Sequence, residues 1–222
     1  MTAGTETEAG TNGQVERPVP RDVTFDELLR GRRSVRRMRT DAIPRDIIEA
    51  VLEAARWAPS PHGTQPWRFV VLQDRAVRER LTDAMAGSWQ HNLAMDGQDG
   101  SIVQQRLEGS RRRMLEAPVL ILVSLFTEDL EEYPDPVRQQ SEITMAIQSL
   151  GACVQNMLLA AFRLGIDGGW MCAPLFCPDI VRSALDLPES HVPHALIPLG
   201  YAAADPKRRE RRSLNDLITR WE

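Results

Sequence analysis

Four arginines and one serine occur within six residues near the start of the chain. They are Arg32, Arg33, Ser34, Arg36 and Arg37. Guanidinium groups form paired hydrogen bonds that match phosphate oxygens, and a hydroxyl can add another. In an extended conformation alternate side chains share a face, so Arg32, Ser34 and Arg36 would point the same way. The segment is therefore a candidate phosphate cradle, although a solvated basic surface would have the same composition.

A second polar cluster occupies the proline-rich segment at positions 58–67, which contains three prolines. Proline fixes φ and removes a backbone donor, which excludes a helix or a central strand here. We expect a stiff, extended loop that presents Ser60, His62, Thr64 and Gln65 at fixed positions. A connector without any ligand remains the alternative.

A third segment, residues 165–171, combines three glycines with a tryptophan. Gly165 would end a helix, and Gly168 and Gly169 would let the backbone approach a neighbour closely. Their N–H groups, together with that of Trp170, could face a planar ligand. An ordinary turn between a helix and a strand is the alternative. A basic arm at positions 205–214 is the last unusual segment.

The elements that must position these segments follow from the hydrophobic pattern. Residues 1–21 are polar and predict a disordered tail, whereas 22–222 predict one domain. The apolar run 119–126 predicts a central strand covered on both faces. We predict helices at about 24–31, 44–56, 74–85, 101–115, 138–164 and 177–185, and a short helix after 214. Further strands are predicted at 68–72 and 194–201.

The long helix 138–164 is apolar nearly all round and should lie in the core or in a subunit interface. Segment 87–100 is predicted to be a mobile lid or a substrate wall.

The composition excludes several classes of function. The net charge is −4 and aromatic residues make up only 5%, which argues against nucleic-acid binding. Polar residues interrupt the apolar run 143–164, so we expect a buried helix rather than a membrane span, and the N-terminus lacks a signal sequence. The chain has no CxxC pair among its three cysteines, Cys153, Cys172 and Cys177, so we expect no metal site. Free thiols favour a reducing compartment, and we therefore expect a cytoplasmic location. No hydrolase or nucleotide-loop motif occurs, so chemistry carried by a bound cofactor is favoured.

The order of these motifs resembles that of the nitroreductase family over about residues 24–220. The carriers are Arg-Arg-Ser-x-Arg at 32–36, Ala-Pro-Ser-x-x-x-x-Gln-Pro-Trp at 58–67, the glycine-tryptophan turn at 165–171 and the basic tail at 207–212. The resemblance implies FMN as cofactor and an α+β fold with a central, mostly antiparallel sheet flanked by helices. It also implies an intertwined homodimer that acts on a small-molecule substrate.

The same resemblance assigns roles to individual residues. Arg32, Ser34 and Arg36 would hold the flavin's phosphate, ribityl chain and pyrimidine edge, with Arg36 near N1 and O2. Pro59 and Ser60 would come from the other subunit and pack near the isoalloxazine. Gly169 and Trp170 would supply backbone contacts near N5 and O4, and Arg209 and Arg211 would complete the phosphate grip. The implied cofactor-binding set is Arg32, Arg33, Ser34, Arg36, Pro59, Ser60, His62, Thr64, Gln65, Gly168, Gly169, Trp170, Arg209 and Arg211.

One position departs from the family pattern. Gly63 stands where the family usually has an asparagine, so His62 or Thr64 would have to replace that amide contact. His62 is also the candidate proton donor, the only catalytic side chain predicted. Flavin chemistry needs no protein nucleophile.

The resemblance narrows to the FMN-binding half of the two-domain enzymes of coenzyme F-420 biosynthesis. Segment 58–72, Tyr133-Pro134-Asp135 and the 176–187 stretch carry this likeness. It implies reduction of a dehydro precursor of the deazaflavin by hydride transfer from reduced FMN. Two alternatives stay open: a broad NAD(P)H-dependent nitro or quinone reductase, and a flavin- or deazaflavin-binding protein without catalytic activity.

Overall fold

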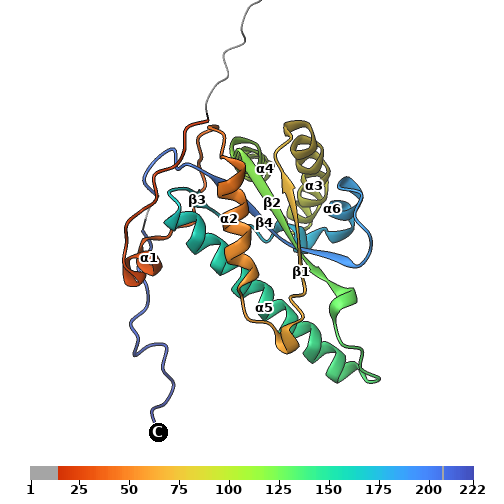
Figure 1. Ribbon diagram of the computed structural model, residues 1–222. Helices are drawn as coiled ribbons and strands as arrows, with labels where there is room; N and C mark the ends of the chain where they lie inside the picture. Colours follow the sequence, from red (N-terminus) through yellow and green to blue (C-terminus); the bar gives the residue numbers. More distant parts are fainter. Residues whose placement is uncertain (1–14, 207) are drawn as a thin grey trace, which may run out of the picture.

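The computed structural model describes residues 15–206 and 208–222, and its centre is a four-stranded antiparallel sheet (Figure 1). The order across the sheet is β1-β2-β4-β3. The strands are β1 (Trp67–Leu72), β2 (Val119–Phe126), β3 (Asp167–Gly168) and β4 (His191–Gly200). Mostly antiparallel pairing was predicted and is confirmed.

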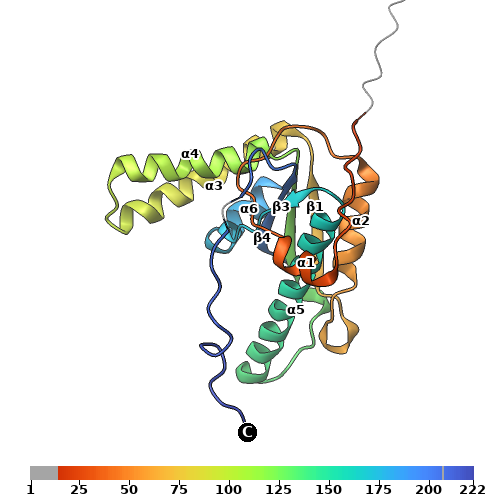
Figure 2. The same ribbon diagram turned by 90° about the vertical axis from the view of Figure 1, so that its left-hand side faces the viewer.

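Helices cover both faces of this sheet. Helices α2 (Arg45–Arg56) and α5 (Pro136–Arg163) pack on one face, and α3 (Arg75–Met95) and α6 (Pro178–Ala184) pack on the other (Figures 1 and 2). Strand β2 lies between them, and alternate side chains enter the two cores. Seven of its eight residues are buried, which confirms the predicted central strand.

Helix α5 crosses the sheet and is the longest helix of the described chain (Figure 1). Ala146, Val154 and Leu158 pack in the core, whereas Ile147 on another face is 39% exposed. By length and composition α5 could cross a membrane, but 44% of its most apolar window is buried inside the protein. A core helix has the same composition, so its packing accounts for its hydropathy.

The prediction for residues 74–100 was wrong in part. Helix α3 continues past position 85 to Met95, and α4 (Gly100–Glu116) begins after a short turn in which Gly97 has φ 67°. Gly87 did not end the helix, because a single glycine costs only about 1 kcal/mol and packing overrides it. Buried Leu93 and Val103 lie in the outer half of this hairpin. The α3–α4 hairpin projects from the body as an arm (Figure 2).

The proline-rich segment is also less extended than predicted. Residues Pro61–Gly63 form a short 3-10 turn, η1, and both His62 and Gln65 have positive φ, at 53° and 50°. Proline at the first position favours such a turn. The turn was not predicted because three prolines in one segment are also typical of an extended loop. Turn η1 packs against α5.

The two ends of the domain differ from their predictions as well. Part of the predicted disordered tail, positions 1–14, lies outside the described residues. Residues 15–21 run along the body, and the Arg21 guanidinium contacts the carboxylate of Asp167 at 3.2 Å. The short C-terminal helix does not form within 208–222: Leu214 and Leu217 are exposed and have no core to pack on. Helix α1 (Phe25–Gly31) does form, and a capping box between Thr24 and Glu27 begins it.

Candidate active site

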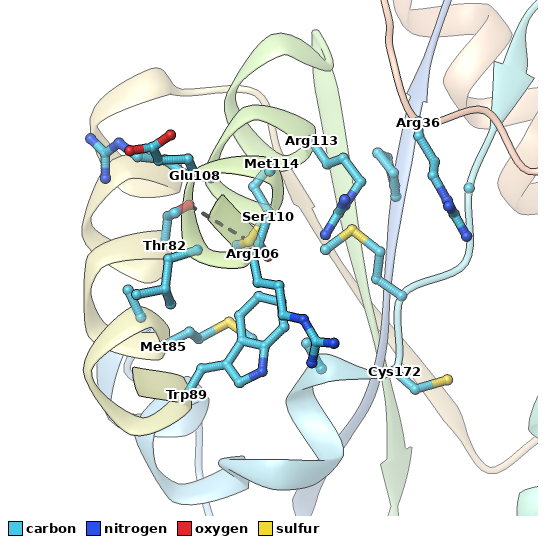
Figure 3. A pocket seen from close by; sticks show the side chains of 18 of the residues that line it. Arg36, Thr82, Met85, Trp89, Arg106, Glu108, Ser110, Arg113, Met114 and Cys172 are labelled. Atoms are coloured by element: carbon cyan, nitrogen blue, oxygen red, sulfur yellow. Dashed lines mark hydrogen bonds between the residues drawn. The ribbon is translucent and has the colours of Figure 1, made fainter. Parts of the chain in front are cut away.

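A cavity of about 900 Å³ lies between the body of the domain and the α3–α4 hairpin (Figure 3). Ser34 and Arg36 border it on one side, and Gly169 and Trp170 border it near the sheet edge. The hairpin supplies the opposite wall. Its lining is predominantly apolar and includes Met85, Met114, Met171, Ala173 and Phe176. Binding sites for organic cofactors have this size and character.

Backbone hydrogen bonds bring the arginine segment and the glycine turn together. The N–H of Val35 donates to the carbonyl of Gly168 at 3.0 Å, and Ser34 forms a single parallel bridge with Gly168, so the segment lies beside β3. The N–H of Gly169 donates to Pro198 at 3.1 Å. Two motifs that lie more than 130 residues apart thus border one cavity.

The glycines are needed for this packing. A Cβ on Gly168 would lie 2.8 Å from a methyl of Leu158, and one on Gly169 would lie 2.9 Å from the carbonyl oxygen of Val35. The close approach predicted for these glycines is therefore made to the protein itself. Gly169 borders the cavity as well, whereas Gly168 is buried within β3.

Positive charge is concentrated in two places: Arg32, Arg33 and Arg211 lie in and near the adjoining arginine segment and do not line the cavity, whereas Arg36 and Arg113 line it. Burial lowers the pKa of Arg32, and the neighbouring Arg211 and Arg33 lower it further. Burial likewise lowers the pKa of Arg113, with a further contribution from Arg36. Within the described ranges, none of these five arginines pairs with a carboxylate. The buried Nε of Arg32 also has no hydrogen-bond partner. An anionic group would relieve this repulsion.

The C-terminal arm contributes to the first of these places. Arg211 acts on Arg32 although 179 positions separate them in the chain, so the basic arm returns to the arginine segment. Arg209 is exposed. Arg33 has a local role too: its guanidinium donates to the carbonyls of Arg30 and Arg32, which stabilises the end of α1.

The proline-rich loop does not border this cavity. Its side chains bond within the loop: the Ser60 hydroxyl accepts from the N–H of Gln65 at 3.0 Å, and the Thr64 hydroxyl donates to the carbonyl of Pro61 at 3.1 Å. Thr64 and Gln65 instead line a separate, open hollow of about 590 Å³. Pro59 and His62 line neither space. One protomer therefore brings together only part of the predicted site.

The hairpin adds residues that the sequence did not single out as binding residues. Trp89 and Arg106 point into the cavity from α3 and α4, and Arg113 lies across from Arg36 (Figure 3). Trp89 lies in segment 87–100, which the sequence predicted to be a mobile lid or a substrate wall; its contact with a substrate stays a prediction. A seven-residue spacing of Arg106 and Arg113 was the available signal for α4, because two helical turns place both on one face. In the part of the chain that the structure describes, no group of three His, Cys, Asp or Glu side chains could hold a metal.

Comparisons with known proteins agree with this geometry. The family model described as "Nitroreductase family" matches residues 29–201. A Bacillus subtilis protein described as an NAD(P)H nitroreductase is 25% identical over 193 residues, which cover 87% of this chain and 92% of that one. The crystal structure of a BluB-like flavoprotein from Clostridium difficile is 23% identical, with a TM-score of 0.76, and covers 90% of this chain and 100% of that one. A Desulfovibrio desulfuricans protein described as a nitroreductase, solved in complex with FMN, is 27% identical with a TM-score of 0.69, over 91% of this chain and 99% of that one.

The chain belongs to the nitroreductase family, a family of FMN-dependent oxidoreductases. It is accordingly an oxidoreductase with the nitroreductase-like fold. Its own residues fit the flavin nucleotide on two counts. The arginines named above have no carboxylate partner in the described part of the chain and suit a phosphate, and the apolar cavity suits a planar ring system.

Proposed function

We propose that this protein holds FMN in the cavity beneath the α3–α4 hairpin and uses NAD(P)H to reduce small planar acceptors such as nitro compounds or quinones. The observation that carries the proposal is a group of arginines that have no carboxylate partner among the described residues: Arg36 and Arg113 line a large, mostly apolar cavity, and Arg32, with Arg211 near it, lies in the adjoining arginine segment. The description of the Bacillus subtilis relative supports the nicotinamide donor. The three free cysteines agree with a cytoplasmic enzyme.

The residues of this chain would divide the work of binding. Arg32 and Arg211 would bind the phosphate with charge-assisted hydrogen bonds, and Ser34 would bond the ribityl chain. Arg36 and Arg113 would place positive charge beside the pyrimidine edge, where it stabilises an anionic reduced ring. When bound, FMN supplies the hydride that the acceptor receives. The hairpin would exclude water from that face of the cavity.

The proline-rich loop would complete the site from a second copy of the chain. In one protomer its residues lie away from the cavity and use their polar groups within the loop. The family resemblance assigns Pro59 and Ser60 to the partner's site, which requires a homodimer. His62 would serve as proton donor only in such an assembly.

A second candidate is the reduction of the dehydro precursor of coenzyme F-420. The observation that favours it is the excess of positive charge beyond that needed for one phosphate, because this substrate carries phosphate and carboxylate groups of its own. Arg106 lines the cavity without a carboxylate partner among the described residues.

A comparison of turnover separates these functions. The purified, FMN-loaded protein is supplied with NADH or NADPH and with either a quinone, a nitroaromatic or the dehydro precursor. Efficient turnover of the first two supports the broad reductase, and a kcat/KM at least tenfold higher for the precursor supports the second candidate. A bound flavin that neither NADH nor NADPH reduces would refute the NAD(P)H-dependent reductase. If flavin reduced with dithionite also fails to reduce the dehydro precursor, the second candidate is refuted too, which leaves a flavin-binding protein.

A further inference from the structure

The cavity has a second positive end, on the α3–α4 hairpin. Arg106 and Arg113 are seven residues apart on α4, which separates them by about 10 Å along one face of the helix. Arg113 lies at the end occupied by Arg36, as the lowered pKa of its guanidinium also indicates. Arg106 lies at the other end, beside Trp89 (Figure 3).

The charges on this wall leave Arg106 available. Arg111 forms an ion pair with Asp83 on the neighbouring helix. The carboxylate of Glu108 accepts a hydrogen bond from the Gln104 amide at 3.0 Å. Arg106 forms no ion pair or hydrogen bond within the ranges that the structure describes. Arg106 is exposed and lines the cavity, so its guanidinium donors are free to bind a ligand there.

The surroundings of Arg106 favour a ring over a flexible chain. The indole of Trp89 is half-buried and faces the cavity, and the Met85 and Met114 side chains form an apolar floor behind it. An indole offers a flat face for stacking, and methionine sulfur packs well against aromatic edges. A guanidinium beside such a face matches an aromatic carboxylate or phosphate.

We infer that Trp89 and Arg106 form a substrate subsite that selects planar acceptors carrying an anionic group. The inference rests on the proposed function, since it requires FMN to be bound at the Arg36 end of the cavity and the acceptor to lie next to it, at the Arg106 end. Trp89 stacks on the ring of the acceptor, and Arg106 binds its carboxylate. The hairpin thus determines specificity in addition to covering the cavity.

Two probes of nearly equal shape test this subsite: 4-nitrobenzoate and the neutral 4-nitrobenzamide. The FMN-loaded wild type should bind the carboxylate more tightly by calorimetry and reduce it with the higher kcat/KM. Loss of one charge-assisted hydrogen bond typically weakens binding about tenfold or more. In Arg106→Gln the preference for the carboxylate over the amide should therefore fall about tenfold, in both measurements.

Two further variants complete the design. Arg112→Gln removes an exposed arginine from the same helix that does not line the cavity, so it should keep the wild-type preference. Trp89→Leu should weaken both probes, whereas Trp89→Phe should restore most of the binding, because a ring is retained.

The outcomes separate the two claims. If the preference for the carboxylate over the amide is the same in the wild type and in Arg106→Gln, the subsite is refuted. Reduction of both probes would still support the proposed function. If neither probe is reduced, the proposed function fails, and the calorimetric preference by itself decides whether Arg106 selects anions.

Discussion

At the scale of single residues, Arg36 contributes most to the proposed binding of FMN. It borders the cavity, and its charge acts on Arg113 across it. We expect Arg36→Gln to raise the dissociation constant for FMN about tenfold to a hundredfold, since a hydrogen bond to a charged group contributes about 1.5–3 kcal/mol. Fluorescence titration of the apoprotein measures this. Arg37→Gln is the matched control, because Arg37 is exposed and does not line the cavity. Equal affinities in the two variants would contradict the assignment.

The buried thiol of Cys153 gives a prediction on pH. Burial raises its pKa from 9.0 to about 12, so the folded protein keeps this proton after the unfolded chain has lost it. The contribution to stability is complete below pH 9 and is lost as the pH rises towards 12, by about 1 kcal/mol at pH 10. Urea unfolding at pH 8 and pH 10 should show this loss in the wild type and in Cys172→Ala. Cys153→Ala should show a smaller loss, since the buried thiol of Cys177, whose pKa burial also raises, still contributes. Parallel behaviour of all three proteins would disprove the cause.

At the scale of elements, the α3–α4 hairpin is positioned by one buried arginine. The Arg78 guanidinium donates to the carbonyls of Leu115, at 3.4 Å, and Ala117 at the end of α4, and burial lowers its pKa. We expect Arg78→Met to destabilise the protein by about 1–3 kcal/mol, since those carbonyls lose their partner. Faster hydrogen exchange in residues 100–116 should accompany the loss. Arg75→Met removes only an exposed pair with Glu79 and should change little; an effect as large as that of Arg78→Met would contradict this role.

The elements also show how far the sequence could be interpreted. Periodic or continuous apolar runs predicted β2, α2 and α5 well, because burial dictates those patterns. The outer half of α3 was missed, since a glycine and polar residues conceal a helix that is stabilised by packing on α4. The helix predicted after position 214 does not form for the opposite reason: its apolar residues Leu214 and Leu217 are exposed and pack on no surface of the described residues.

The candidate site was predictable only in part. Ser34, Arg36, Gly169 and Trp170 were identified from the types and spacing of their neighbours, and the structure places all four at one cavity. Trp89 and Arg106 stand in segments without a motif, and only the antiparallel packing of two helices brings them together. Binding roles for all of these residues stay predictions.

At the scale of the whole molecule, the proposal requires two chains. We expect the protein to sediment at twice its chain mass of 25.0 kDa, with each site combining Arg36 of one chain with the proline-rich loop of the other. Arg36→Gln and Ser60→Trp should each be poorly active alone. Mixing the two after dissociation should restore about a quarter of the wild-type activity, because half of the random dimers are mixed and each contains one intact site. No recovery in demonstrably mixed dimers would show that the loop does not act across the interface.

The most direct test of the central claim is the visible spectrum of the purified protein, recorded before and after anaerobic addition of NADH or NADPH. We expect a yellow protein with one FMN per chain, whose absorbance at about 450 nm is bleached by NADH or NADPH and returns when a quinone is added. A colourless protein that does not take up added FMN, or one whose bound flavin neither donor can bleach, would contradict the central claim.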